Sequence, residues 1–151
     1  MIDKKHIGMD LGTMTLDVER GRLRFFAKSI GQTDPVYTDL EAARAAGHPD
    51  LPVPPTFFFS LELETRDGFG YLETMGVDLR RLLHGEQRFT YHRVAHAGER
   101  LTLHTTIADI TAKKGGAMEL ITRATRVTDE NGELVAESRG LMVVRNPEVA
   151  A

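Results

Sequence analysis

The sequence predicts an α+β fold in which one antiparallel β-sheet wraps around a central α-helix. Three observations predict this fold: a short alternating segment near the N-terminus, an apolar segment after a proline-rich loop, and a series of long alternating segments in the second half of the chain. A sheet with one apolar face needs a cover, and the apolar segment is the best candidate for that cover. The chain has 151 residues, a length that fits one domain, so we expect residues 1–151 to form a single domain.

Composition excludes several classes of protein. With 41% hydrophobic residues, 27% charged residues and a net charge of -3, the chain is expected neither to be disordered nor to bind nucleic acid. The absence of cysteine excludes disulfides, thiolate catalysis and cysteine-ligated metals. The N-terminal residues lack the apolar core of a signal peptide, and no stretch approaches ~18 uninterrupted apolar residues. We therefore expect a cytoplasmic protein that does not enter a membrane.

Periodicity predicts one strand and two helices before the proline-rich loop. Residues 14–18 alternate apolar and polar side chains, which predicts a short strand. Residues 20–31 repeat apolar side chains at i, i+3, i+4 and i+7 and end in a glycine, which predicts an amphipathic helix. Residues 38–46 are rich in alanine and precede Gly47, which predicts a second, shorter helix.

The proline-rich loop and the apolar segment after it define the expected central helix. Residues 51–55 contain three prolines, which exclude a helix or a central strand there. Thr56 is then placed to cap the helix that follows. That helix begins with phenylalanine at residues 57–59, and three adjacent aromatic side chains cannot share one stripe. We expect its first turn to be buried on most sides.

Four long alternating segments are expected to complete the sheet. They span residues 86–95, 99–112, 117–128 and 133–145. The breaks between them lie at residues 97–98, 113–116 and 129–132. Each break contains a glycine, which can supply positive φ, so each is expected to be a hairpin turn in an antiparallel meander. One face of the second segment carries Leu101, Leu103, Thr105 and Ile107, and one face of the fourth carries Leu134, Ala136, Ser138, Gly140, Met142 and Val144.

The turn Gly31-Gln32-Thr33-Asp34-Pro35-Val36-Tyr37 resembles an active-site turn of the MaoC-like hydratase and dehydratase family. In that family the run reads Gly-Asp-x-Asn-Pro-x-His. The resemblance extends over most of the chain in three blocks, at residues 25–37, 47–57 and 83–99. The chain is similar to the N-terminal, FAS1-like dehydratase domain of the family, and this resemblance implies the hot-dog fold.

The same resemblance implies chemistry on an acyl thioester. Family members add water to an enoyl thioester, or remove it from a hydroxyacyl thioester, and an Asp and a His move the proton. Here Gln32 and Tyr37 occupy those two places, while Asp34 occupies the place of the family's Asn. Gln32 cannot accept and return a proton near pH 7, and Tyr37, with an ordinary pKa of about 10, is a poor general base. We therefore assign no catalytic residue in this chain.

The implied function is that of a subunit. The chain is expected to bind acyl-CoA or acyl-ACP within an (R)-specific enoyl-CoA hydratase or 3-hydroxyacyl dehydratase, a hydro-lyase whose Asp and His come from a catalytic hot-dog partner. No cofactor and no metal are expected. An isolated curled sheet leaves uncovered edge strands, so we expect a homodimer, a heterodimer or a heterotetramer.

Two further segments supply candidates for substrate binding. Thr56 and Phe57 at the start of the central helix are expected to have free backbone N–H groups, which would stabilise a thioester oxyanion. His84 and Gly85 are expected just before a strand, where a histidine can titrate near neutral pH and a glycine allows close approach to a ligand. The complete set of substrate-binding candidates is Gln32, Asp34, Tyr37, Pro55, Thr56, Phe57, His84 and Gly85.

Two other functions stay open. A hot-dog acyl-CoA thioesterase would activate water with a carboxylate near the central helix, where Glu62, Glu64 and Glu73 lie. A non-catalytic homodimer that binds acyl-CoA is the third possibility. His92 and His96 have i, i+4 spacing but straddle a strand end with no carboxylate motif, so we do not expect them to bind a metal.

Overall fold

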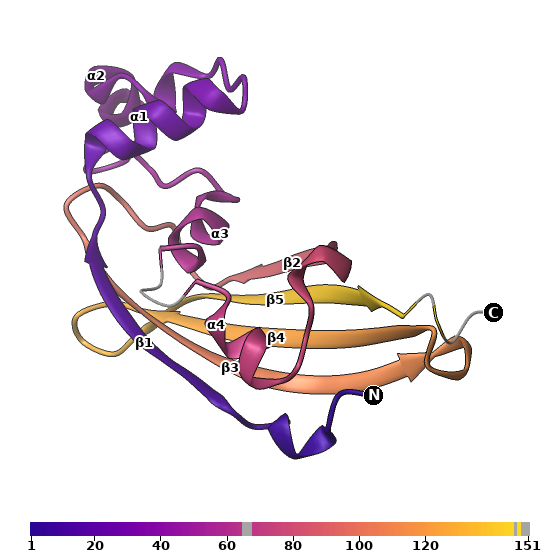
Figure 1. The fold of residues 1–151 in the computed structure, drawn as a ribbon. Coiled ribbons are helices and arrows are strands. Elements are labelled where there is room, and N and C mark those ends of the chain that lie inside the picture. The colour runs from indigo at the N-terminus through magenta and orange to yellow at the C-terminus, as the bar shows by residue number, and fades with distance from the viewer. Residues whose placement is uncertain (65–67, 147, 149–151) are drawn as a thin grey trace.

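The computed structural model describes residues 1–64, 68–146 and 148, and its centre is a five-stranded antiparallel sheet in the order β1-β3-β4-β5-β2 (Figure 1). The strands are β1 (Asp10–Asp17), β2 (Leu82–Tyr91), β3 (Arg100–Lys113), β4 (Met118–Thr128) and β5 (Leu134–Arg145). The α-helices are α1 (Arg20–Ser29), α2 (Leu40–Ala45), α3 (Phe57–Glu62) and α4 (Gly70–Thr74). Short 3-10 turns are η1 (Lys4–His6), η2 (Pro35–Tyr37), η3 (Leu79–Arg81) and η4 (Lys114–Gly116). No helix in these described ranges is long and apolar enough to cross a membrane.

Helices occupy two positions relative to the sheet. In Figure 1, α3 and α4 lie over one face of the sheet, whereas α1 and α2 form a separate layer beyond one end of it. The predicted amphipathic helix is confirmed as α1, which buries Leu23 and Ala27. The predicted alanine-rich helix is confirmed as α2, which is capped by the Asp39 side chain accepting a hydrogen bond from Ala42 N at 2.9 Å.

The predicted meander is only partly correct. Strands β3, β4 and β5 are consecutive neighbours, but β2 pairs with β5 at the far edge of the sheet. The segment at residues 97–98 is therefore part of a crossover between β2 and β3 and not a hairpin turn. The expected face of β3 is confirmed, since Leu101, Leu103 and Ile107 are buried on it. The expected face of β5 is confirmed for Met142 and Val144 but is wrong for Leu134, because the register with β4 shifts between Val127 and Thr128.

Strand β2 also begins earlier and ends earlier than predicted. It spans Leu82–Tyr91, so His84 and Gly85 lie inside the strand and not before it. The sheet register shifts between His84 and Glu86, which makes Gly85 the extra residue of a β-bulge. A bulge interrupts the alternation of inward and outward side chains along a strand, so the alternating pattern in the sequence does not reveal the start of β2.

The central helix is shorter and capped differently than predicted. Phe57 and Phe58 are buried, as expected for its first turn, and the helix ends at Glu62. Thr56 has α-helical backbone angles, and its side chain makes no capping hydrogen bond. The N–H of Phe57 donates to the carbonyl of Pro54 at 2.9 Å. The predictions of a Thr56 cap and of a free Phe57 N–H are therefore wrong, because the proline-rich loop folds into a turn that continues into the helix.

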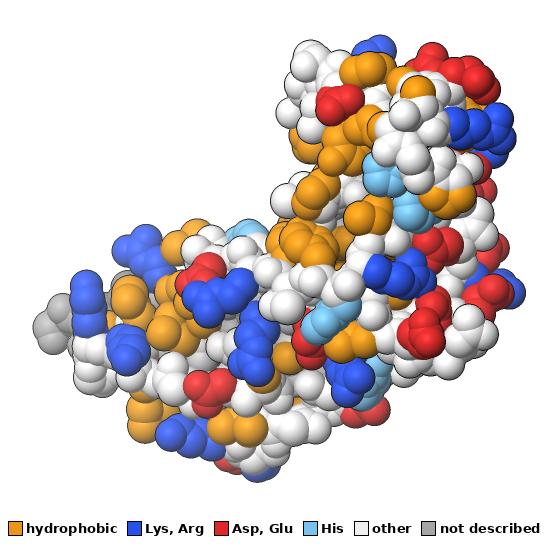
Figure 2. Space-filling model, turned by 180° about the vertical axis from the view of Figure 1, so that it is seen from behind, with side chains coloured by type: hydrophobic (Ala, Val, Ile, Leu, Met, Phe, Trp, Pro, Cys, Tyr) orange, Lys and Arg blue, Asp and Glu red, His pale blue; other side chains and the backbone are white. Residues whose placement is uncertain are grey.

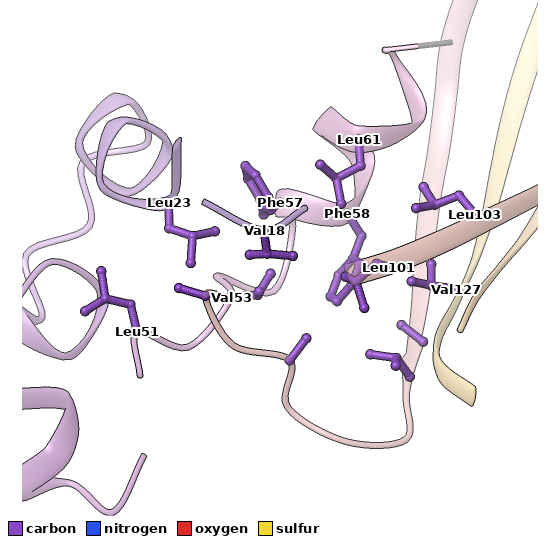
Figure 3. Packing of buried hydrophobic residues seen from close by; sticks show 14 of the residues in the cluster. Val18, Leu23, Leu51, Val53, Phe57, Phe58, Leu61, Leu101, Leu103 and Val127 are labelled. Atoms are coloured by element: carbon purple, nitrogen blue, oxygen red, sulfur yellow. The ribbon is translucent and has the colours of Figure 1, made fainter. Parts of the chain in front are cut away.

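The hydrophobic core has two clusters. One joins α1 and α3 to the near ends of β3 and β4, through Leu23, Phe57, Leu61 and Leu101 among others (Figure 3). The other joins α4 to the far ends of the strands and is formed by Leu72, Met75, Val77, Ile107, Ile110, Ile121, Met142 and Val144. Polar side chains separate the two clusters, and these form the candidate site.

Candidate functional site

Two neighbouring cross-strand rows on the helix-covered face of the sheet carry polar side chains. The first row aligns Thr105, Thr125 and Ser138 on β3, β4 and β5. The second aligns Arg123 on β4 with Gly140 on β5, and Gly140 with Gln87 on β2. With Glu62 from the end of α3, these side chains form what we call the polar belt: Glu62, Gln87, Thr105, Arg123, Thr125 and Ser138.

Glu62 is the centre of the polar belt. Its Oε2 accepts a hydrogen bond from Arg123 Nη2 at 3.0 Å, and its Oε1 accepts one from the Ser138 hydroxyl. Burial raises the pKa of the Glu62 carboxyl, and the Ser138 hydrogen bond and the Arg123 charge oppose that shift. Thr105 Oγ1 and Thr125 Oγ1 lie 2.9 Å apart and satisfy one another beside the pair.

Two cavities meet at Arg123, which lines both of them. A cavity of about 440 Å³ lies between β1 and the α3–α4 side of the fold, and its wall includes Glu62, Tyr71 and Thr105. A second cavity, of about 320 Å³, lies between α3 and β2. Burial raises the pKa of Tyr71, whose hydroxyl points at the sulfur of Met142 at 3.6 Å. Residues of the polar belt thus line two spaces large enough for small ligands, and Arg123 is the belt residue that both share.

The bulge at Gly85 places His84 on the second cavity. In a regular strand His84 and Gln87, three residues apart, would face opposite sides. Here they pair with Met142 and Gly140, which share one face, and His84 Nε2 lies 3.3 Å from Gln87 Oε1. The imidazole ring stacks on Phe59 of α3, with ring centroids 5.1 Å apart and planes 8° from parallel. A Cβ on Gly85 would lie 3.0 Å from Val143, so glycine also fits the close approach to β5.

The turn that carries the family resemblance has a local structural basis. Gly31, at φ +70°, ends α1: its N–H donates to Lys28 O at 3.1 Å, and Gln32 N donates to Ala27 O at 2.9 Å. Gln32 Oε1 then accepts a hydrogen bond from Asp34 N at 3.0 Å, and Asp34 accepts one from Val36 N at 3.0 Å. Asp34 therefore caps η2; Tyr37 is the last residue of η2, and Gln32 precedes the cap.

The remaining candidates lie at the start of α3. Phe57 packs edge-on against Phe26 of α1 at a centroid distance of 5.2 Å, which connects the helix start to the α1 layer. The Pro55 carbonyl accepts a hydrogen bond from the Tyr91 hydroxyl of β2 at 2.8 Å. Pro55 and Thr56 are exposed. The structure thus links the α3 candidates to α1 on one side and to β2 on the other, but no hydrogen bond among the described residues joins the turn at 32–37 to His84.

The sequence did not single out Arg123, Ser138 or Gln87 as site residues. A signal existed for Arg123, because it shares a strand face with Ile121 and Val127, where a charged residue is unexpected. Of the three carboxylates considered near the central helix, Glu62 is buried, Glu64 pairs with Arg22, and Glu73 is exposed.

The histidines have different neighbours. His92 Nε2 lies 3.0 Å from Glu137, whereas His96 Nε2 lies 3.1 Å from His48 Nδ1. Burial lowers the pKa of His96, and Glu99, whose carboxylate lies 3.4 Å from its ring, opposes that shift. Within residues 1–64, 68–146 and 148, no group of three or more His, Asp or Glu side chains is arranged to hold a metal ion.

Residues 5–138 match the family model described as the FAS1-like, dehydratase domain region. The chain belongs to the FAS1-like dehydratase domain family, which is part of the MaoC-like hot-dog family. The UPF0336 protein of Streptomyces coelicolor is similar to this FAS1-like dehydratase domain: 38% of 138 aligned residues are identical, and the alignment covers 91% of each chain.

Solved structures show the same fold. A chain of the C-terminally truncated HadBC complex, a (3R)-hydroxyacyl-ACP dehydratase from Mycobacterium tuberculosis, superposes on this FAS1-like dehydratase domain with a TM-score of 0.78, 24% identity and coverage of 91% of this chain and 96% of that chain. A MaoC-like dehydratase superposes with a TM-score of 0.83, 23% identity and coverage of 95% of this chain and 43% of that chain. The hot-dog fold expected from the sequence is confirmed.

Proposed function

We propose that this FAS1-like dehydratase domain is the acyl-binding subunit of an acyl-thioester hydratase or dehydratase, and that a catalytic hot-dog partner supplies the Asp and the His. The observation that carries the proposal is the turn at residues 32–37. Its sequence resembles the family turn, and Asp34, at the place of the family's Asn, caps η2 before Pro35. Its two reacting positions hold Gln32 and Tyr37, and the Gln32 oxygen is used to hold the turn itself.

A glutamine and a tyrosine at these places suit binding better than proton transfer. An amide is neither an acid nor a base near pH 7, and a phenol is a hydrogen-bond donor and a weak base. Substrate water could still be oriented by either group. Support for a partner comes from the HadBC structure, in which the (3R)-hydroxyacyl-ACP dehydratase is a complex. The substrate proposed here is accordingly an enoyl or 3-hydroxyacyl thioester of CoA or ACP.

Hydration of crotonyl-CoA and of a longer enoyl-CoA tests the proposal. The full-length chain, a hot-dog partner from the same genome with an intact Gly-Asp-x-Asn-Pro-x-His run, and their mixture are assayed by loss of enoyl absorbance. We expect the mixture to be far more active than the sum of its parts. An ordinary enzymatic rate from the chain alone would overturn the proposal.

Matched variants locate the catalytic groups. Gln32→Ala and Tyr37→Phe in this chain should each change the activity of the mixture by less than tenfold, because a group that transfers the proton is worth roughly 10²–10⁴-fold. Replacing the partner's Asp by Asn is the positive control and should remove nearly all activity. A hundredfold loss from Tyr37→Phe, with the assembly intact on a sizing column, would place catalysis in this chain.

One observation favours the thioesterase as a second candidate. Glu62 is a carboxylate on the wall of the 440 Å³ cavity, and its raised pKa is a property of many general bases. Both of its oxygens are already engaged, one by Arg123 and one by Ser138, which leaves it poorly placed to activate water. Release of free thiol from acyl-CoA, abolished in Glu62→Gln, would establish this second function.

A further inference from the structure

Two buried nitrogen atoms of the polar belt have no hydrogen-bond partner among the described residues. They are Nε2 of Gln87 and Nε of Arg123, and both residues line the cavity between α3 and β2. The Arg123 side chain is 9% exposed. Buried donors in native proteins are almost always paired, because an unpaired donor loses its bonds to water with nothing in return. Two such donors on one cavity suit a ligand that carries an acceptor atom.

Gly140 lies between these two residues and leaves room for the Gln87 amide. It lies directly between Arg123 on β4 and Gln87 on β2 in one cross-strand row. Its φ is not in the positive range that requires glycine. A Cβ there would lie 2.9 Å from Gln87 Oε1, so any larger residue would displace the Gln87 amide. Glycine at this position therefore makes space for the Gln87 side chain, and the backbone conformation alone does not require it.

The rest of the cavity wall is largely hydrocarbon. It includes Phe59 and Leu63 from the α3 segment, Leu82 on β2 and Met142 on β5. A ligand that fits such a wall is a hydrocarbon chain, and the two unpaired groups on its floor can only donate. An acyl chain that pairs with both groups would carry an acceptor oxygen at the depth of the polar belt.

The charge around the floor favours a neutral oxygen. Glu62 binds Arg123 Nη2 at 3.0 Å, so the arginine charge is already balanced. A second carboxylate next to Glu62 would be repelled, as two carboxylates that share a site cannot easily both be ionised. A keto or hydroxyl oxygen meets the same two donors without that cost.

We propose that the cavity between α3 and β2 binds an acyl chain that carries a keto or hydroxyl group along its length, and that Gln87 and Arg123 donate hydrogen bonds to this oxygen. The inference rests on the proposed function for the identity of the ligand as an acyl thioester. It adds the substrate class: acyl chains that are oxygenated away from the thioester.

Binding of matched acyl-CoAs to the full chain, alone and with its partner, tests the inference. Calorimetry compares a medium-chain acyl-CoA with derivatives that carry one oxo group at successive carbons, and with the derivative that ends in a carboxylate. One oxo position should bind roughly tenfold more tightly than the unsubstituted chain, as expected for two added hydrogen bonds. Equal affinity for all derivatives, or tightest binding by the carboxylate, would overturn it.

Two variants test whether Gln87 and Gly140 cause the preference for the oxo derivative. Gln87→Leu and Gly140→Ala should each remove most of the preference for the oxo derivative while the unsubstituted acyl-CoA still binds. Gly21→Ala on α1 is the matched control, since a Cβ there meets nothing within 4 Å and should leave the preference unchanged. A preference that survives both β-sheet variants contradicts the inference. These experiments measure binding and not turnover. Failure of the partner mixture to hydrate enoyl-CoA would contradict the proposed function, whereas loss of the preference for the oxo derivative would contradict only this inference.

Discussion

Glu62 and Arg123 form an ion pair whose side chains are 2% and 9% exposed. Removal of charged groups from water costs several kcal/mol per ion and is offset only where their hydrogen-bonding atoms find partners. Glu62 meets this condition through Arg123 and Ser138. Arg123 does not, because its Nε has no partner among the described residues. A pair built in this way contributes little net stability, which agrees with a role in ligand binding.

At this scale we expect Arg123→Met to lower the free energy of unfolding at pH 7 by about 3–5 kcal/mol, because Glu62 is left as an unpaired buried carboxylate. The loss should be smaller at pH 5. Burial raises the pKa of Glu62, so the folded chain holds a proton that the unfolded chain has released, and stability falls as pH rises between the unfolded and folded pKa values. Urea unfolding at both pH values measures the effect.

A double variant distinguishes the electrostatic cost of an unpaired Glu62 from the packing cost of replacing Arg123. Glu62→Leu combined with Arg123→Met removes both charges and should be more stable than Arg123→Met alone, since no unpaired ion remains. If the double variant is the less stable of the two, the loss in Arg123→Met comes from packing and the electrostatic account is wrong.

At the scale of elements, one ion pair fixes α1 to the loop that leads into α3. Arg20, the first residue of α1, donates to both oxygens of Asp50, through Nε at 2.9 Å and Nη2 at 2.6 Å. Asp50 also accepts a hydrogen bond from the N–H of Leu51, which is fully buried in the first core cluster. The hydrogen bonds and charge of Arg20 lower the pKa of Asp50 to about 2. This clamp holds the α1 layer against the start of the central helix.

Asp50→Asn should therefore lower the free energy of unfolding at pH 7 by about 1 kcal/mol, a modest value because the Arg20 side chain is 47% exposed. Asp50 has a folded pKa below its ordinary value, so its contribution is complete above about 4 and is lost as pH falls toward about 2. The variant should lose less stability than the wild type over that interval. Thermal unfolding between pH 2 and 7 measures both curves, with the exposed Glu41→Gln as control. Parallel curves for Asp50→Asn and the wild type would rule the clamp out.

The elements differ in how far the sequence predicts them. Helix α1 follows from local spacing that ends at Gly31, and both are as predicted. Strand β2 does not, because its start is hidden by the Gly85 bulge and its pairing with β5 is a long-range choice. The Thr56 cap fails for a similar reason: the turn at Pro54 leads Thr56 into helical backbone angles, and a capping residue needs extended ones. The sequence predicts structure that depends on the pattern within one segment. It does not predict structure that depends on which of several segments pair with one another.

At the scale of the whole molecule, the candidate site depends on pairings that no single segment contains. The turn at residues 31–37 was found because its residues are contiguous. The polar belt was missed because it needs the register of three strands and the end of α3 to bring Gln87, Arg123 and Glu62 together. The role of Gly140 in making space for Gln87 is recognised only when its two neighbours in the cross-strand row are known. This is why the sequence predicted the family and fold but not the floor of the cavity.

The molecule also leaves apolar surface uncovered. Figure 2 shows hydrophobic side chains exposed at the inner corner between the helical layer and the sheet. Large apolar residues are exposed on and just beyond β2, where Leu83 is 52% exposed, Tyr91 46% and Val94 50%. Strand β2 is one edge of the sheet, so its outer backbone groups can pair with another strand. Strand β1 is the other edge, so the exposed apolar side chains of β2 are what favour β2 as the place where a second hot-dog chain attaches.

We therefore expect Leu83→Glu to weaken assembly, whether the second chain is another copy or the catalytic partner. A charge buried at the centre of a protein interface, where charged residues are depleted, is expected to reduce affinity by at least about tenfold. The fold should persist, because Leu83 is exposed in the isolated chain. Ile7→Glu is the control: Ile7 is 41% exposed and precedes β1, at the opposite edge of the sheet. Sedimentation of each variant, alone and with the partner, measures the assembly.

Loss of assembly in Ile7→Glu but not in Leu83→Glu would assign the interface to β1. A wild-type chain that stays monomeric both alone and with the partner would show that neither edge strand forms such an interface.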